Sequence, residues 1–166
     1  MLLIMKKLLL TVVLIVGISF CGKAQGVFKL GANVGLASSD ALNGSDLSLG
    51  VDAYYMFGYN DAFLSFGPTV GYRNFFIDNN NRYFYRDDAQ FVPVAGAARV
   101  KVFGIFTGGI DVGYAFGISD YLDGGFYVRP IAGIDVGDFI EINVSYENYS
   151  DRFNWGNANV GVLFQF

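Results

Sequence analysis

The side chains of this chain that could do chemistry are charged residues that alternate with apolar ones. Ten of them, five of each sign, lie in such segments: Lys29, Asp52, Arg73, Arg99, Lys101, Asp111, Arg129, Asp135, Glu141 and Glu147. Neighbouring carboxylates can work in pairs as general acid and base. Equal numbers of opposite charges favour structural ion pairs instead, because a buried charge needs a partner. We therefore predict a structural ion network rather than a catalytic site.

Other residue types restrict the chemistry further. The sequence has no His and one Cys, which excludes His-based triads, His-ligated zinc and disulfides within the chain. No phosphate-binding loop, metal-ligand spacing or pair of nucleophile and base is visible. The sequence therefore predicts no catalytic residue, no metal and no cofactor.

Composition places the chain among proteins that hide or bury apolar surface. Its 166 residues are 17% aromatic and 16% charged, whereas an average globular chain has roughly 25% charged residues. This balance excludes a disordered chain, and the length predicts one domain. A soluble domain of this composition would struggle to cover its surface, so the protein covers it with a partner or lies in lipid.

The N-terminus has the pattern of an export signal. Lys6 and Lys7 precede an apolar run from Leu8 to Phe20, and small residues lie at positions −3 and −1 before Gln25. The run is too short for a membrane-spanning helix of about 20 residues. We predict cleavage after Ala24.

Cleavage there would divide the chain into a signal peptide, residues 1–24, and a mature domain, residues 25–166. Three lysines leave with the signal, which leaves eight of the 11 basic residues against 15 acidic ones. This balance argues against nucleic acid as a partner. A lipoprotein anchored on Cys21 and an uncleaved anchor are the alternatives.

Eight segments of the mature chain alternate between apolar and polar or small residues, which is the period of a β-strand. Long polar connections interleave with tight ones, as in outer-membrane barrels, which have short turns at one end and longer loops at the other. The pattern predicts an all-β fold, an eight-stranded antiparallel up-and-down transmembrane β-barrel. The segments are Val27–Ala37, Leu47–Phe57, Leu64–Arg73, Phe91–Val102, Gly109–Ile118, Tyr127–Val136, Ile140–Glu147 and Asn157–Phe166.

Side-chain volume predicts which face points outward. An eight-stranded barrel is just wide enough for side chains to fill it, and the apolar set of Phe, Tyr, Leu and Ile is too bulky for that space. Gly, Ser, Asn, Thr and the ten charges should therefore line the lumen. A soluble ligand carrier of lipocalin type, with the reverse polarity, is the alternative.

Three details of the barrel follow from the sequence. Counting residues from the tight turns places Arg99 and Lys101 at the level of Asp135 and Glu141, and Arg129 at the level of Glu147 and Asp111. Proline cannot donate to a strand ladder, which predicts a bulge or late strand start at Pro93 and ladder gaps at Pro68 and Pro130. Outward aromatics lie near the strand ends, where membrane interfaces would be: Phe28, Tyr55, Phe57, Tyr72, Phe116, Phe126, Tyr146, Phe164 and Phe166.

Three features make the chain resemble the bacterial outer membrane protein β-barrel domain family, the small PorT-like and OmpX-like eight-stranded barrels. They are the Ala24-Gln25 junction, Phe91-Val92-Pro93-Val94 followed by Arg99-Val100-Lys101, and a last strand that ends in Phe166. The resemblance implies export to the outer membrane of a diderm bacterium, with both termini in the periplasm and four surface loops. It implies outer-membrane lipid and lipopolysaccharide as surroundings, and barrel-assembly machinery that reads Phe166 as an assembly signal.

The longest loop holds a candidate contact patch, defined as Arg82, Tyr83, Phe84, Tyr85 and Arg86. It could bind a surface protein or lipopolysaccharide, or it could simply extend the strands above the membrane. We expect a non-enzymatic barrel with a filled lumen that acts structurally or through its loops. Secretion-accessory and small-channel roles are alternatives. A lipid-modifying enzyme is less favoured, because known barrel enzymes of that kind rely on His.

Overall fold

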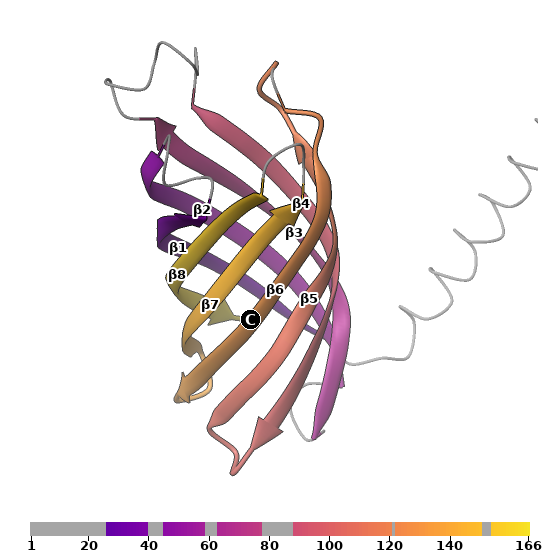
Figure 1. Ribbon diagram of the computed structural model, residues 1–166. Coiled ribbons are helices and arrows are strands. Elements are labelled where there is room, and N and C mark those ends of the chain that lie inside the picture. The colour runs from indigo at the N-terminus through magenta and orange to yellow at the C-terminus, as the bar shows by residue number, and fades with distance from the viewer. Residues whose placement is uncertain (1–25, 40–44, 59–62, 78–87, 121, 151–153) are drawn as a thin grey trace, which may run out of the picture.

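Eight strands close into a single barrel (Figure 1). The computed structural model describes residues 26–39, 45–58, 63–77, 88–120, 122–150 and 154–166. Each strand is antiparallel to its neighbours, and the last pairs with the first, which confirms the predicted eight-stranded antiparallel architecture. No helix among these residues is long and apolar enough to cross a membrane. The strands are β1 (Gly26–Ser39), β2 (Ser45–Phe57), β3 (Leu64–Ile77), β4 (Ala89–Val102), β5 (Phe106–Gly117), β6 (Gly125–Val136), β7 (Ile140–Ser150) and β8 (Asn154–Gln165).

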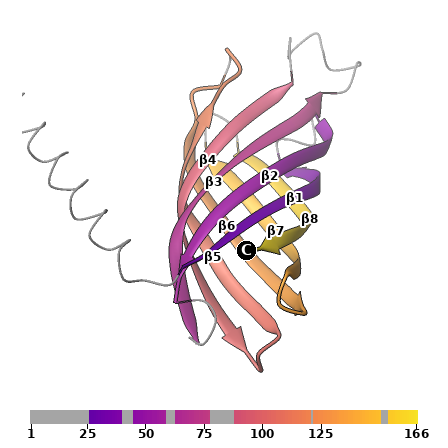
Figure 2. The ribbon, with the colours of Figure 1, turned by 180° about the vertical axis from the view of Figure 1, so that it is seen from behind.

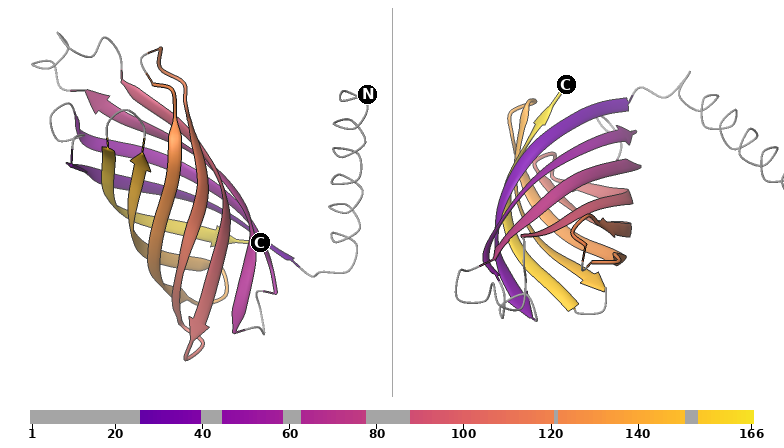
Figure 3. Two further views of the ribbon diagram at one scale, coloured as in Figure 1. Left: turned by 45° about the vertical axis from the view of Figure 1, so that its right-hand side comes forward. Right: turned by 90° about the horizontal axis from the view of Figure 1, so that it is seen from above.

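The strands slant steeply around the barrel axis (Figures 2 and 3). The pairing explains the slant. A path that starts at Lys29 and passes through the paired residues of every strand returns to β1 at Ser39. Such a stagger is what tilts the strands of a closed barrel. Residues at one height on the barrel therefore lie at different distances from the ends of their strands.

The barrel has two different ends, which we call the turn end and the loop end. The turn end carries the connections 58–63, 103–105 and 137–139, and the loop end carries the other four. Both ends of the described chain lie at the turn end, where the Phe28 N–H donates to the Phe166 carbonyl at 3.3 Å and the Phe166 N–H donates back at 2.8 Å.

Side chains alternate between the inside and the outside along each strand. In β6, Arg129 is 2% exposed and faces the lumen, whereas Phe126 and Ile134 face outward and are about half exposed. The same alternation holds on the other strands. Most large apolar side chains face outward, and the lumen holds the polar and small ones together with some apolar ones, among them aromatic rings near the loop end. Apart from these buried apolar side chains, this is the polarity that side-chain volume predicts.

Each of the three prolines interrupts one ladder without shifting the register. The predicted gaps at Pro68 and Pro130 are confirmed, on the β2 side and the β7 side respectively. The prediction of a bulge or late strand start at Pro93 is wrong. β4 already begins at Ala89, and Pro93 causes a ladder gap towards β3, as Pro68 and Pro130 do in their ladders, with the same register on both sides of the gap. The opposite ladder stays paired at all three prolines, so the missing N–H costs pairing on one side only.

The β4–β5 turn contains a strained residue. Phe103 has φ 53° and is 89% exposed, and Gly104 follows with φ 74°. A turn with positive φ at both positions favours Asn-Gly. We expect Phe103→Asn to raise the free energy of unfolding by about 1 kcal/mol, measured by urea unfolding in micelles.

Phe139→Asn is the matched control for that substitution. Phe139 is a turn-end phenylalanine, 72% exposed, and it is not among the residues with positive φ. It should therefore report only the loss of an exposed ring. Equal effects of the two substitutions would contradict the role assigned to backbone strain.

Candidate functional site

The ten charged residues of the alternating segments all face the lumen. Nine of them are at most 9% exposed, and the Lys101 side chain, nearest the turn end, is 23% exposed. They come from seven of the eight strands, so closure of the barrel is what brings them together. Burial of so many charges requires that they be paired and hydrogen-bonded.

Four of them form what we call the central cluster: Arg73 of β3, Arg129 of β6, Asp52 of β2 and Glu147 of β7. Arg73 Nη2 lies 2.9 Å from Asp52 Oδ1 and 2.6 Å from Glu147 Oε1. Arg129 Nη1 lies 2.7 Å from Asp52 Oδ2, and its Nε lies 3.4 Å from Glu147 Oε1. Each carboxylate therefore contacts both guanidinium groups, and the four charges cancel.

Arg73 satisfies every donor group of its guanidinium. Its Nε donates to Glu147 at 2.9 Å, and its Nη1 donates to the carbonyl oxygens of Val51 and Tyr72 at 3.1 and 3.0 Å. The residue is 0% exposed. A planar fork with several fixed donors suits such a position better than the single ammonium of lysine.

Neutral side chains complete the hydrogen bonds of the two carboxylates. The Tyr149 hydroxyl donates to Glu147 Oε2 at 2.8 Å, and the Tyr127 hydroxyl donates to Glu147 Oε1 at 3.3 Å. The Asn33 amide donates to Asp52 Oδ2 at 2.9 Å. The arrangement holds both carboxylates as acceptors within a fixed network.

Three further ion pairs lie between the central cluster and the turn end. Lys29 Nζ is 2.7 Å from Glu141 Oε2, Arg99 Nη1 is 2.7 Å from Asp111 Oδ1, and Lys101 Nζ is 2.6 Å from Asp135 Oδ2. Tyr54 links this layer to the central cluster, because its hydroxyl donates to Asp111 Oδ2 at 2.9 Å and accepts from Arg129 Nη1 at 3.2 Å.

The count from the tight turns predicts levels and not partners. Lys101 pairs with Asp135, and Arg129 contacts Glu147, at the levels that the count gives them. The partners of Arg99 and Glu141 are residues that the count does not place beside them, Asp111 and Lys29 of β1. The count ignores the stagger of the strands, which shifts the height of each residue from strand to strand.

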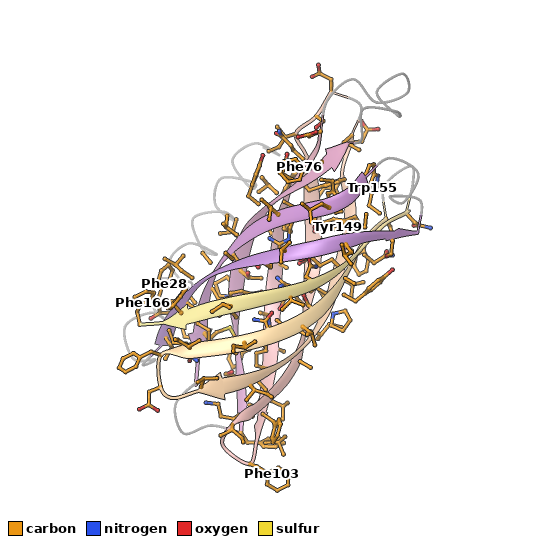
Figure 4. All side chains as sticks on the ribbon, turned by 90° about the vertical axis from the view of Figure 1, so that its left-hand side faces the viewer. Phe28, Phe76, Phe103, Tyr149, Trp155 and Phe166 are labelled. Carbon is orange, nitrogen blue, oxygen red and sulfur yellow. The ribbon has the colours of Figure 1, made fainter. Side chains whose placement is uncertain are left out.

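Sequence reasoning missed the aromatic plug, which fills the lumen at the loop end: Phe75, Phe91, Tyr127, Tyr149 and Trp155. All five are at most 2% exposed. The Phe91 and Tyr149 rings stack at 4.8 Å, and Phe75 contacts Trp155 edge to face at 5.4 Å. Figure 4 shows Tyr149 and Trp155 near the loop end, opposite Phe103 at the turn end. The alternation of side chains along each strand could have identified these residues. Phe75 and Phe91 lie an even number of positions from the inward residues Arg73 and Arg99, so they point into the lumen as well.

The β5–β6 connection folds inward over the plug. Leu122 is 6% exposed and packs in the same apolar cluster as the five rings. Ser119 holds the connection, because its hydroxyl donates to the Asp88 carbonyl at 2.7 Å and accepts from the Gln90 N–H at 3.2 Å. The loop end of the lumen is therefore closed by side chains.

The turn end is open by comparison. A cavity of about 690 Å³ lies there, with the Lys101–Asp135 pair and Gln165 among its polar lining and Phe139 and Phe166 among its apolar lining. Phe166 itself is 75% exposed. Across the described segments, no group of three or more metal-ligating side chains could hold a metal ion. The contact patch at residues 82–86 lies outside the described residues.

Comparison with known proteins identifies the fold. No family model and no curated protein matches the sequence. Among solved structures, the N-terminal β-barrel domain of Pseudomonas aeruginosa OprF is similar with a TM-score of 0.58 and 14% identity, over 87% of this chain and 100% of that one. Ail, the attachment invasion locus protein of Yersinia pestis, gives 0.56 and 13%, over 86% and 99%. Neisserial surface protein A gives 0.53 and 12%, over 85% and 97%. These neighbours are small eight-stranded outer-membrane barrels, and the chain shares their fold.

Proposed function

We propose that the chain is an integral outer-membrane β-barrel protein with a side-chain-filled lumen, and that it acts structurally or through its surface loops. The polarity of the barrel carries this proposal. Outward residues such as Leu36, Phe66 and Val144 are 65%, 60% and 56% exposed, whereas Arg73 and Glu147 are fully buried. A soluble carrier barrel has the opposite arrangement, and a closed barrel satisfies its backbone hydrogen bonds within lipid.

Strand length and the outward aromatics support a membrane location. The strands have 11 to 14 residues, enough for the roughly 9 to 11 that a tilted strand needs to cross the hydrocarbon. Outward aromatic side chains lie towards both ends, including Phe28 and Phe164 at the turn end and Phe116 and Phe126 at the loop end. Two such girdles are typical of transmembrane barrels.

Membrane fractionation tests this location. The full chain, expressed in a diderm bacterium, should stay in the membrane pellet after carbonate extraction and should sediment with outer-membrane rather than inner-membrane markers. Release into the soluble fraction would contradict the proposal, because it would mean that the apolar exterior is covered by something other than lipid.

Export and assembly complete the proposal. We assign residues 1–24 to a cleaved signal peptide and residues 25–166 to the barrel domain. Phe166 would be the residue read by the barrel-assembly machinery, supported by its exposed position directly after β8, where its backbone pairs with Phe28. Within outer-membrane barrels we favour the PorT-like and OmpX-like group. The loop contact patch would bind lipopolysaccharide or a surface protein.

A small channel is the second candidate, favoured by the cavity at the turn end. Against it, the aromatic plug and the central cluster both cross the lumen. We expect the purified barrel to show no steady open state in planar bilayers. The variant Phe91→Ala/Trp155→Ala should stay closed as well, because the central cluster remains. A steady current through the unmodified protein would contradict a filled lumen.

A further inference from the structure

The outer face of the barrel has a groove of about 540 Å³, which we call the outer groove. The hollow arises because two small outward side chains, Ala32 and Ala53, are diagonal neighbours on β1 and β2. Ala53 pairs with Leu30, and Ala32 pairs with Val51. Larger side chains stand around them. The lining residues are Leu30, Gly31, Ala32, Val51, Asp52, Ala53, Val70, Gly71, Tyr72 and Phe164.

The outer groove runs obliquely from the turn end towards the loop end. Leu30 pairs with Phe164 of β8 on one side and with Ala53 of β2 on the other, and Ala53 pairs with Val70 of β3. These four residues form one row across four strands. The stagger carries such a row towards the loop end as it passes from β8 to β3. The lower end of the groove, which is the end nearest the turn end of the barrel, therefore lies at Phe164.

The chemistry of the lining selects a hydrocarbon occupant. Every outward side chain is apolar except for the phenol of Tyr72. The Asp52 side chain points the other way, where it contacts Arg73 and Arg129 in the lumen. A headgroup or polar peptide in the groove would lose hydration without gaining partners. An alkyl chain has no such hydration to lose there.

A second copy of the chain fits the groove poorly. A closed dimer must present the same patch on both subunits, and two concave patches placed face to face leave a void between them. Such voids are unfavourable because their lining atoms lack contacts. An acyl chain of the surrounding bilayer can fill the groove without requiring a matching ridge.

We propose that the outer groove binds one acyl chain of a phospholipid from the turn-end leaflet, with the headgroup beside Phe28 and Phe164. This inference rests on the proposed membrane location. The position of the lower end favours that leaflet over lipopolysaccharide, which would enter from the loop end. The bound chain would be held more tightly than the lipid around the rest of the barrel, because it would contact the larger side chains beside Ala32 and Ala53 as well as these two alanines.

Native mass spectrometry of the full chain, with dioleoyl phosphatidylethanolamine added to the detergent, tests the proposal. The unmodified protein should retain one phospholipid. Ala53→Phe fills the groove and should reduce retention at least about tenfold, and Ala32→Phe is the second filling variant if the first does not fold. Ala132→Phe on β6 is the matched control, because Ala132 faces outward beyond the groove, and it should retain the lipid.

Several results would overturn the inference. Equal retention by the unmodified protein and the folded filling variants would do so, as would equal loss in Ala132→Phe. Preference for hexa-acylated lipid A over phospholipid would refute the assigned leaflet, and a dimer abolished by Ala53→Phe would identify a second copy as the occupant.

The membrane location is tested separately with Ala132→Trp, because brominated lipids should quench the fluorescence of the added tryptophan. Without quenching, the membrane proposal fails; with quenching but no selective retention, only the groove assignment fails.

Discussion

Replacing Arg73 with methionine should lower the free energy of unfolding by about 3 to 5 kcal/mol. Arg73 is completely buried and is within 2.9 Å of both Asp52 and Glu147. Its removal leaves two buried carboxylates to share Arg129. The uncompensated charge, rather than the lost packing, accounts for most of the expected cost.

Urea unfolding in micelles measures this effect, with the folded fraction determined from the gel mobility of the folded barrel. The control is the double variant Arg73→Met/Glu147→Gln, which restores charge balance around Asp52 and Arg129. It should be more stable than Arg73→Met alone, because the two sites are coupled. If the double variant were less stable than the unmodified protein by the sum of the effects of Arg73→Met and Glu147→Gln alone, the ion network would not determine the cost.

Replacing Gly109 with alanine should cost about 3 kcal/mol. A Cβ added at Gly109 would clash with the Ala98 carbonyl oxygen and would lie 2.7 Å from Arg99 Cδ. The first clash is with the backbone of a paired strand, so it cannot be relieved by a rotamer change. The second would displace the side chain that holds Asp111.

The adjacent Gly108 provides the matched control for that substitution. It lies on the same strand and faces outward, and an added Cβ there meets no atom within 4 Å. Gly108→Ala should therefore be neutral or stabilise the barrel by about 0.5 to 1 kcal/mol. Comparable destabilisation by both substitutions would show that the inward clash does not explain the effect.

The sequence by itself determined the strands and their two faces. Alternation is a local property, because successive side chains of a strand point to opposite sides. It therefore placed Asp52, Arg73 and Glu147 on one face without knowledge of any partner. Volume then assigned that face to the lumen, since the whole apolar set, to which Phe66 and Leu30 belong, is too bulky for eight strands to enclose.

Only the tertiary structure decided which lumen residues meet. Glu141 pairs with Lys29, and Arg99 pairs with Asp111, because closure with a stagger fixes the height of each residue relative to all others. The same stagger gathers Phe91, Tyr149 and Trp155 into the aromatic plug. Strand phase tells which way a side chain points, whereas its height and its partner across the lumen depend on pairings around the whole barrel.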